Sequence, residues 1–467
     1  MQEYDLIIIG GGAGAFGAAI KANELGANTL LVNKGLPLGG TCVNVGCVPS
    51  KRLLRAGEIL HLAKHHGIQG IELEVKDFDF AKVVQDELEL VSDLRQGKYE
   101  DVLKSASYVK HVDGAAKFIA DDQIEVDGKS YRAKKFVITA GSTANVPPVE
   151  GLPKAGYMTH IQALKLHQRP KSLVIIGAGP QGLEFGQMFA RFGTKVTILQ
   201  RANSIMPKAE PELAARLSEI LANEDIDIQT NVEVKSVRKE GNQKAVAYSK
   251  EGKIHEIVGQ EILLAAGKTA NTAGLDLNRA GVEVDDHYSI KVNQSLQTAN
   301  SNVFAAGDVN NLPLRQEPNA GREGTYAAEN ALTGSQKSID YNVVPYTIFT
   351  DPQLAGVGFT EDEQMKQMGV CDCRTISFKQ VPRALIMNRT EGLIKMAIHP
   401  ETKQIMGVHI LAPDAGELIA QAMTLIQNKN TIDDVVDSLP MFPTLSEAIK
   451  LVALSFTKDI SKLSCCI

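Results

Sequence analysis

The residues best suited to do chemistry in this sequence are its six cysteines, which fall into three close pairs: Cys42/Cys47, Cys371/Cys373 and Cys465/Cys466. Structural zinc sites usually combine two C-x₂-C motifs, whereas four residues separate Cys42 from Cys47 and no partner motif is present. If this segment opens a helix, the helix dipole favours the thiolate form. We therefore predict that Cys42 and Cys47 form a redox pair; the alternative is two buried, inert cysteines.

Two glycine-rich turns mark the elements that must position this pair. Residues 4–35 read as buried strand, turn, helix and strand, and the turn from Gly10 through Gly12 to Ala15 matches G-x-G-x-x-A. Gly177, Gly179 and Gly182 give a full G-x-G-x-x-G between another strand and helix. Such turns let a pyrophosphate approach the backbone at a helix N-terminus. The sequence therefore predicts two dinucleotide sites.

Further strand-to-glycine segments occur at 135–142, 260–268 and 301–309. The last one ends in Gly307-Asp308, and an aspartate at the carboxyl end of a buried strand faces the ligand crevice of an open α/β sheet. Asp308 could also cap a following helix. From about residue 341 the apolar residues alternate as in antiparallel strands, and two later segments have helical periodicity. We expect an α/β protein with two Rossmann-like domains and a C-terminal α+β domain, packed tightly together.

The bulk composition excludes several functions. The net charge of −6 provides no basic surface for nucleic acid or an anionic membrane. No stretch is apolar and long enough to span a bilayer, and the acidic, glycine-rich N-terminus does not fit a secretion signal. We expect a cytoplasmic protein with neither nucleic acid nor membrane as a partner.

The order of these motifs resembles that of the flavoprotein disulfide reductases, the class I pyridine nucleotide-disulfide oxidoreductases. The segment GGTCVNVGCVPSK is similar to their redox-active segment, and IFTDPQLAGVGFTE is similar to the opening of their interface domain. The resemblance covers essentially the whole chain and implies a homodimer, in which the partner's C-terminal domain completes the active site. It implies an FAD-binding domain (1–146), an NADPH-binding domain (147–270), a return segment completing the FAD domain (271–340) and an interface/dimerisation domain (341–467).

The resemblance also implies roles for individual residues. Cys47 would lie against the flavin, Cys42 would be the interchange thiol, and Lys51 would pair with Glu184 near the flavin. Asp308 would bind the ribityl chain of FAD. Asn33 stands where the family usually has an acid for the adenosine ribose. The other residues that the resemblance places at the cofactors are Gly10, Gly12, Gly14, Ala15, Lys34, Gly40, Thr41, Ala115, Ala140, Gly141, Gly177, Gly179, Gly182, Gln200, Arg201, Gly267 and Gly307.

Phe442 determines the expected substrate. Disulfide-reducing members carry a His–Glu pair in a segment reading H-P-T-L-S-E, in which the histidine protonates the departing thiolate. Here the segment runs from Phe442 to Glu447, and phenylalanine cannot transfer a proton. Hg(II) fits this arrangement, because it is a soft cation that prefers thiolates, and its reduction needs two electrons and no proton on a leaving sulfur. The tail sequence LSCC resembles that of the mercury-reducing members, whose tail thiols, here Cys465 and Cys466, pass Hg(II) to the inner pair, here Cys42 and Cys47 of the partner subunit.

We therefore expect an NADPH- and FAD-dependent enzyme that reduces Hg(II), supplied as thiol complexes, to Hg(0). One alternative is a dihydrolipoamide dehydrogenase-like flavoprotein acting on another acceptor, and another is a non-catalytic thiol protein that binds soft metals. The tail cysteines could also be adventitious. Pro180 and Thr444 stand where some mercury-reducing members have tyrosine.

Two further expectations concern cofactor choice and the remaining cysteines. Gln200 and Arg201 replace the acid that would bind an NAD ribose and repel a 2′-phosphate, which favours NADPH; the alternative is an ordinary surface arginine. Cys371 and Cys373 would share one face of a strand. They could form a side thiol site, but we expect an ordinary pair of strand residues in the interface domain.

Overall fold

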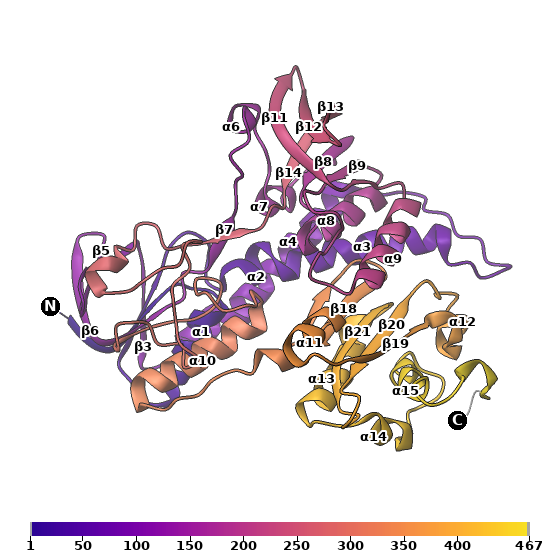
Figure 1. Cartoon of the computed structure of the whole chain (residues 1–467). Coiled ribbons are helices and arrows are strands. Elements are labelled where there is room, and N and C mark those ends of the chain that lie inside the picture. Colours follow the sequence, from indigo (N-terminus) through magenta and orange to yellow (C-terminus); the bar gives the residue numbers. More distant parts are fainter. Residues whose placement is uncertain (1, 465–467) are drawn as a thin grey trace.

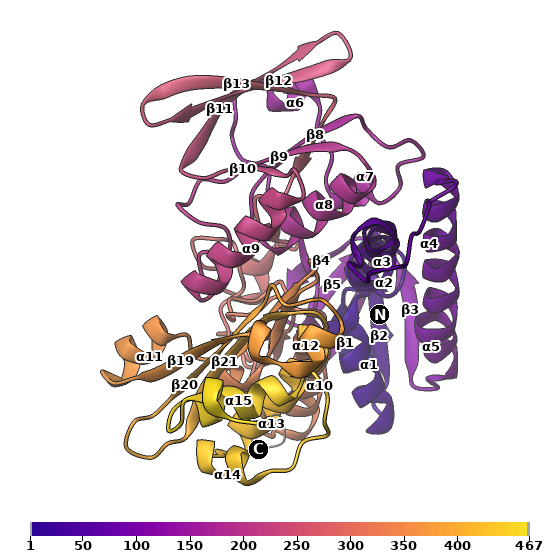
Figure 2. The same ribbon diagram turned by 90° about the vertical axis from the view of Figure 1, so that its right-hand side faces the viewer.

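The computed structural model describes residues 2–464 and arranges them around several sheets (Figures 1 and 2). The first is a seven-stranded sheet in the order β3-β2-β1-β6-β5-β4, in which β16 also pairs with β6. Its strands are β1 (Gln2–Ile9), β2 (Thr29–Asn33), β3 (Val109–Asp113), β4 (Ala116–Ala120), β5 (Gln123–Val126), β6 (Lys129–Ile138) and β16 (Val303–Ala305).

The register of this sheet brings three strand ends together. Ile9, Ile138 and Ala305 lie at matched positions on β1, β6 and β16, which run parallel. The last three residues of each of these strands are buried on both faces, as expected of continuous apolar runs. The helices of this part are α1 (Ala13–Glu24), α2 (Gly40–Val45), α3 (Cys47–His65), α4 (Phe80–Arg95), the π-helix η1 (Gln96–Glu100), α5 (Asp101–Ser105) and α10 (Glu317–Thr333).

A second, four-stranded parallel sheet has the order β10-β9-β8-β14 and lies beside a three-stranded antiparallel sheet, β11-β12-β13. The strands are β8 (Ser172–Ile176), β9 (Lys195–Leu199), β10 (Asp227–Gln229), β11 (Val232–Glu240), β12 (Gln243–Lys250), β13 (Lys253–Gly259) and β14 (Glu261–Leu264). The helices are α6 (Leu152–Ala155), α7 (His160–Ala163), α8 (Pro180–Arg191) and α9 (Pro211–Asn223). The chain enters this part after β7 (Ser142–Ala144) and leaves it through β15 (Lys268–Ala270), and these two strands pair antiparallel. The short helix η2 (Leu277–Ala280) follows.

The last part contains a five-stranded antiparallel sheet in the order β17-β18-β21-β20-β19. Its elements are η3 (Tyr341–Val343), β17 (Tyr346–Ile348), β18 (Gln353–Gly358), α11 (Glu361–Met368), β19 (Asp372–Ser377), η4 (Phe378–Gln380), α12 (Pro382–Ile386), β20 (Leu393–Ile398), β21 (Ile405–Ala412), α13 (Ala415–Gln427), α14 (Ile432–Asp437), α15 (Glu447–Leu454) and η5 (Ile460–Lys462). The expected class, two Rossmann-like parts followed by an α+β part, is confirmed.

The three parts pack against one another directly, as expected. One apolar cluster includes Leu53 of α3, Leu183 of α8 and Leu354 of β18. Beside it, the Arg191 guanidinium donates to Asp351 Oδ2 at 2.9 Å and to Glu224, and Arg389 also pairs with Asp351. Because Arg191 is almost fully buried, its charge depends on the carboxylates of Glu224 and Asp351 for compensation. The pair with Asp351 holds α8 against the start of the antiparallel sheet.

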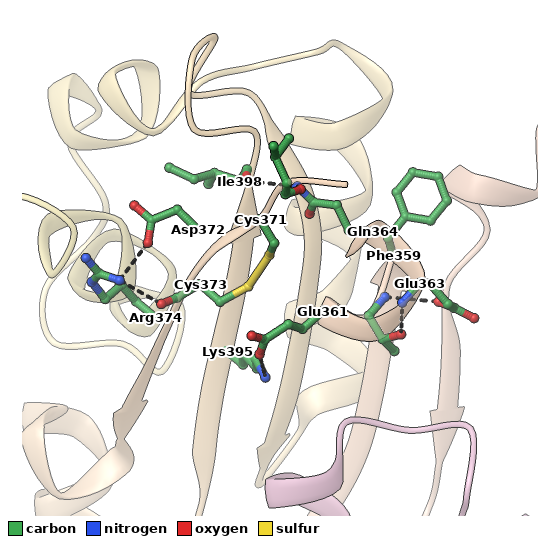
Figure 3. The surroundings of a disulfide bond; sticks show 12 residues. Phe359, Glu361, Glu363, Gln364, Cys371, Asp372, Cys373, Arg374, Lys395 and Ile398 are labelled. Atoms are coloured by element: carbon green, nitrogen blue, oxygen red, sulfur yellow. Dashed lines mark hydrogen bonds and ion pairs between the residues drawn. A yellow bond between two sulfur atoms is a disulfide. The ribbon is translucent and has the colours of Figure 1, made fainter. Parts of the chain in front are cut away.

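Cys371 and Cys373 lie at a strand of the last sheet, as expected, and the structure adds a bond that the sequence did not predict. Cys373 lies on β19 and Cys371 directly precedes that strand, and the two sulfurs form a disulfide (Figure 3). Side chains two positions apart on an extended strand project from the same face, which brings these sulfurs together. No helix among residues 2–464 is long and apolar enough to cross a membrane.

Candidate active site

The Cys42/Cys47 pair lines a cavity of about 750 Å³ that receives residues from all three parts of the fold. The predicted site residues in its wall are Gly12, Gly14, Thr41, Cys42, Cys47, Lys51, Gly141, Glu184, Gly307 and Asp308. Pro180, one of the positions aligned with tyrosine, also lines it. The fold therefore brings both redox thiols, the first glycine turn, the Asp308 turn and the start of α8 to one space.

Short helices hold the thiol segment in place. Cys42 lies in α2, and Cys47 is the first residue of the 19-residue helix α3, so the expected helix start is confirmed. The Asn44 amide donates to the carbonyl oxygens of Pro37, Leu38 and Gly40 at 3.1, 3.1 and 2.8 Å. Arg95 of α4 donates to the Asn44 side-chain oxygen at 3.2 Å. These bonds fix the backbone that presents both sulfurs.

The two thiols are electrostatically different. A hydrogen bond from the Cys42 thiol lowers the pKa of Cys47 to about 7, and the charge of Lys51 acts in the same direction, against burial and the charges of Glu317 and Glu184. The same hydrogen bond, together with burial, raises the pKa of Cys42. The Cys47 side chain is exposed toward the cavity although protein surrounds the segment. Cys47 is therefore the thiol of the pair that ionises near neutral pH, and Cys42 ionises only at higher pH.

Lys51 and Glu184 form the ion pair that the resemblance implies. Lys51 Nζ lies 2.7 Å from Glu184 Oε2, and the carboxylate is nearly buried. Glu184 Oε1 also accepts a hydrogen bond from the Phe349 backbone N–H at 2.9 Å, and the Lys51 ammonium lies 4.6 Å from the centre of the Phe349 ring. This contact joins α3, α8 and the segment after β17 beside the thiol pair.

Lys51→Gln is expected to raise the pKa of Cys47 by roughly one unit, because it removes a nearby positive charge and leaves the Glu184 carboxylate unpaired. The thiolate fraction at pH 7 should fall accordingly. The rate of alkylation of Cys47 as a function of pH measures this shift. Arg55→Gln removes a charge from the same helix at an exposed site and is the matched control. An unshifted profile in Lys51→Gln would contradict the assignment.

The first glycine turn fits the pyrophosphate of FAD. Gly12 is the N-cap residue of α1, and a Cβ placed on it would meet only Gly40 Cα, at 3.7 Å, so one side of the turn is open to the cavity. A Cβ on Gly40, where φ is +62°, would meet Gly12 Cα at 2.6 Å. The close approach of these two glycines therefore keeps the turn free of side chains where a phosphate would meet the N-terminus of a helix.

The Asp308 turn is positioned by a buried carboxyl. Glu323 accepts hydrogen bonds from the Gly307 N–H and the Asn310 amide, each at 2.7 Å, and from the Tyr341 hydroxyl at 2.8 Å. Burial raises the pKa of Glu323. Asp308 accepts from the Ser142 hydroxyl at 2.6 Å. The alternative that Asp308 caps the next helix is wrong, because α10 begins at Glu317.

Other predicted cofactor residues lie away from the cavity wall. Gln200 accepts from the Ala178 N–H at 3.2 Å and donates to the Ser204 carbonyl at 3.1 Å, so its amide braces the second glycine turn. Asn33 donates to the Leu36 carbonyl at 3.0 Å. The remaining ones outside the wall are Gly10, Ala15, Lys34, Gly40, Ala115, Ala140, Gly177, Gly179, Gly182, Arg201 and Gly267. Cys465 and Cys466 lie outside the described residues.

Two residues of the cavity wall, Glu317 and His160, and the nearby Tyr99 were not anticipated. Glu317, the first residue of α10, lines the cavity, and its charge acts on both thiols. His160 lines the same cavity, and burial lowers its pKa to about 4, which keeps it neutral. Tyr99 lies in the π-helix, and burial raises its pKa to about 12. Of these residues, only Glu317 has a local sequence signal: the proline that follows it favours the first turn of a helix and so indicates where α10 begins.

The Phe442–Glu447 segment carries an unpaired acid. Glu447 Oε2 is buried without a hydrogen-bond partner among residues 2–464, and burial raises the pKa of this carboxyl. The Thr444 hydroxyl donates to the Met441 carbonyl at 2.8 Å, and Phe442 is 44% exposed. The acid at the position of the family's His–Glu pair is therefore present, while Phe442 stands at the position of the histidine.

Two Rossmann-like turns, a cavity between them and a thiol pair with one lowered pKa define a two-nucleotide thiol oxidoreductase. The chain belongs to the pyridine nucleotide-disulphide oxidoreductase family, whose profile matches residues 4–324, and the profile of that family's dimerisation domain matches residues 344–453. FAD and a pyridine nucleotide are typical cofactors of this family, and the dimerisation domain supports a homodimer.

Known relatives cover almost the whole chain. A mercuric reductase of Lysinibacillus sphaericus is 38% identical over 467 residues, which are 100% of this chain and 85% of the relative. The mitochondrial dihydrolipoyl dehydrogenase of Pisum sativum is 36% identical, covering 97% of this chain and 91% of the relative. The structure of the HOCl-induced flavoprotein disulfide reductase RclA of Escherichia coli matches with a TM-score of 0.86 at 28% identity, covering 97% of this chain and 100% of that chain. RclA has also been solved as a Cu(II) complex.

Proposed function

We propose that this enzyme reduces Hg(II) to Hg(0) with NADPH: NADPH + Hg²⁺ → NADP⁺ + Hg⁰ + H⁺. The observation that carries the proposal is Phe442 at the position of the proton-transferring histidine, in a segment whose Glu447 Oε2 is buried and has no hydrogen-bond partner within residues 2–464. A disulfide acceptor needs a proton for its leaving thiolate, whereas a thiolate-bound metal ion does not. The likeness to mercuric reductases at up to 38% identity supports this substrate.

The thiols have separate roles in this proposal. The Cys47 thiolate, formed near neutral pH, binds the metal first. The Cys42 thiol releases its proton as its sulfur becomes the second ligand, because soft cations bind thiolates strongly enough to displace protons. FAD, when bound, carries two electrons from the nicotinamide to this site. Lys51 and Glu184 hold α3 and α8 together there, and Cys465 and Cys466 collect the metal for the inner pair of the partner subunit.

We also propose NADPH as the reductant. Residue 200 is Gln200, whose side-chain amide hydrogen-bonds to the backbone of the glycine turn and of Ser204. No carboxylate at this position repels a 2′-phosphate. Arg201 is exposed beside it and can pair with a phosphate. The division into FAD-binding (1–146), NADPH-binding (147–270), return (271–340) and dimerisation (341–467) regions is part of the same proposal.

A second candidate is reduction of another soft or thiophilic acceptor. The Cu(II) complex of RclA, at 28% identity, favours copper within this alternative. The dihydrolipoyl dehydrogenase relative favours a disulfide, but Phe442 opposes it. Activity with Cu(II) or a small disulfide, compared with Hg(II) under the same conditions, separates these substrates.

The central test is oxidation of NADPH driven by Hg(II) in excess small thiol, with NADH as the comparison. We expect Hg(II)-dependent turnover, with a higher kcat/KM for NADPH than for NADH. The Cys465→Ala/Cys466→Ala variant should reduce small thiol complexes normally but should fail with tightly chelated Hg(II). No Hg(II)-dependent oxidation by the wild-type enzyme would defeat the proposal, and an equal or higher kcat/KM for NADH would defeat the nucleotide assignment.

A further inference from the structure

The Cys371–Cys373 disulfide lies at the β19 edge of the five-stranded antiparallel sheet (Figure 3). Neither cysteine lines the redox cavity. The Cα atoms of the two residues are 6.2 Å apart. Among the described strands, β19 pairs only with β20, so its other edge carries no strand. Both side chains are half-buried, and neither belongs to the apolar core of this domain. The pair is therefore within reach of small reagents.

The sulfurs share a face of the sheet with a group of acids. Cys373 and Thr375 point to the same side of β19, and Thr375 pairs in register with Lys395 of β20. The Lys395 ammonium contacts three carboxylates at 2.9, 3.0 and 2.7 Å, those of Glu210, Glu212 and Glu361. Three negative charges against one positive charge leave a field that attracts cations to this side of the strand.

The bond is not needed to hold the strand in place. It joins residues only two positions apart, and so short a loop constrains the unfolded chain little. β19 pairs with β20 from Asp372 to Ser377. On the opposite face, Arg374 donates to Asp372 Oδ1 at 2.6 Å and lies 5.2 Å from the centre of the Phe456 ring. Opening the disulfide should therefore leave the sheet edge intact.

We propose that Cys371 and Cys373 form an accessory soft-metal site that opens on reduction, in which the dithiol binds one two-coordinate cation of the Hg(II) class through both sulfurs. No group of three or more histidine, cysteine, aspartate or glutamate side chains suited to a metal occurs within residues 2–464. A four-coordinate ion such as Zn(II) would therefore lack ligands here. A soft ion that needs only two thiolate ligands would find both of them in Cys371 and Cys373.

The chemistry balances with a low-molecular-weight thiol, RSH, as the reductant. Two RSH give two electrons and two protons to the disulfide by thiol–disulfide exchange, which forms RSSR and the free dithiol. Metal binding then forms two metal–sulfur bonds and releases two protons to water. This site does not depend on the proposed function, since it needs neither NADPH nor the redox cavity.

A chain carrying Cys42→Ser, Cys47→Ser, Cys465→Ser and Cys466→Ser retains only this pair and isolates it. After reduction by a small thiol and anaerobic removal of that thiol, titration with HgCl₂ should give one Hg(II) per chain, measured by metal analysis and thiolate-to-metal absorbance. The oxidised chain should bind none, and the reduced chain should not bind Zn(II). Adding Cys371→Ser and Cys373→Ser is the matched control and should abolish binding.

A second comparison keeps the native enzyme. The reduced holoenzyme should bind one more Hg(II) per chain than the Cys371→Ser/Cys373→Ser variant in the absence of NADPH, while the two show equal Hg(II)-dependent turnover. Three results would overturn the inference. The holoenzyme and the Cys371→Ser/Cys373→Ser variant could bind the same number of Hg(II) ions, or the isolated reduced pair could bind Zn(II) as well as Hg(II). The disulfide could also stay intact in excess small thiol. Because binding is measured without turnover, failure of Hg(II) reduction would leave this result interpretable.

Discussion

Cys47→Ser is expected to lower kcat/KM for Hg(II)-dependent oxidation of NADPH by roughly 10³-fold or more, as for other residues that act as part of a catalytic unit. The reason is that Cys47 is the thiolate of the pair near pH 7, whereas a serine hydroxyl neither ionises in this range nor binds a soft cation. Steady-state kinetics with Hg(II) in excess small thiol measure the effect. Retention of more than about a tenth of the wild-type value would contradict the role of Cys47.

Cys42→Ser provides the matched comparison, because its hydroxyl can still donate a hydrogen bond to the Cys47 sulfur. Turnover should fall here too, since one metal ligand is lost, but rapid alkylation at neutral pH should persist. In Cys47→Ser that rapid alkylation should disappear, because the reactive thiol is gone and burial, which this substitution leaves in place, still raises the pKa of Cys42, the other thiol of the pair. The reverse pattern would mean that the two thiols have exchanged roles.

Gly12→Ala is expected to weaken FAD binding by roughly 100-fold while leaving the apoprotein folded. Gly12 has φ −92° and ψ −166°, which alanine adopts without strain, and an added Cβ would make ordinary contact with Gly40 Cα at 3.7 Å. The methyl group would instead occupy the open side of the turn, where a phosphate must approach the backbone. The flavin-to-protein absorbance ratio and the Kd for FAD on reconstitution measure the loss.

Gly179→Ala tests the second turn in the same way. Gly179 is the N-cap residue of α8, with φ −80° and ψ −175°, and no other atom lies within 4 Å of an added Cβ. This variant should keep its flavin and show a raised KM for the nicotinamide nucleotide. Tm values of both apoproteins should stay close to that of wild type, since glycine-to-alanine at a helix N-cap costs less than about 1 kcal/mol. Loss of flavin from Gly179→Ala with full retention in Gly12→Ala would reverse the assignment of the two turns.

Local features of the fold were predictable from the sequence because they depend on neighbouring residues. The glycine turns at Gly10–Ala15 and Gly177–Gly182 each follow a buried strand and open a helix, as expected. The thiol segment opens α3 at Cys47, also as expected. Periodicity and turn chemistry operate within a few residues, so the order and type of these elements can be read without knowing what they contact.

The electrostatics of the site were not predictable from the sequence. Lys51 and Glu184 are 133 positions apart, and only the resemblance to known proteins suggested that they meet. Nothing near Glu317 in the chain indicates that its charge acts on the thiols. A pKa depends on burial and on the charges that distant segments bring close, and both follow from packing between domains.

The sequence by itself determined that this protein has two nucleotide turns, a thiol pair at a helix start and a phenylalanine in place of the proton donor. Only the tertiary structure decided that Cys47 is the thiolate, that Glu447 has a buried oxygen without a partner within residues 2–464, and that Cys371 and Cys373 are bonded at an open sheet edge. The physical reason is that side-chain identity is encoded residue by residue, whereas ionisation, hydrogen bonding and accessibility depend on which distant segments surround each side chain.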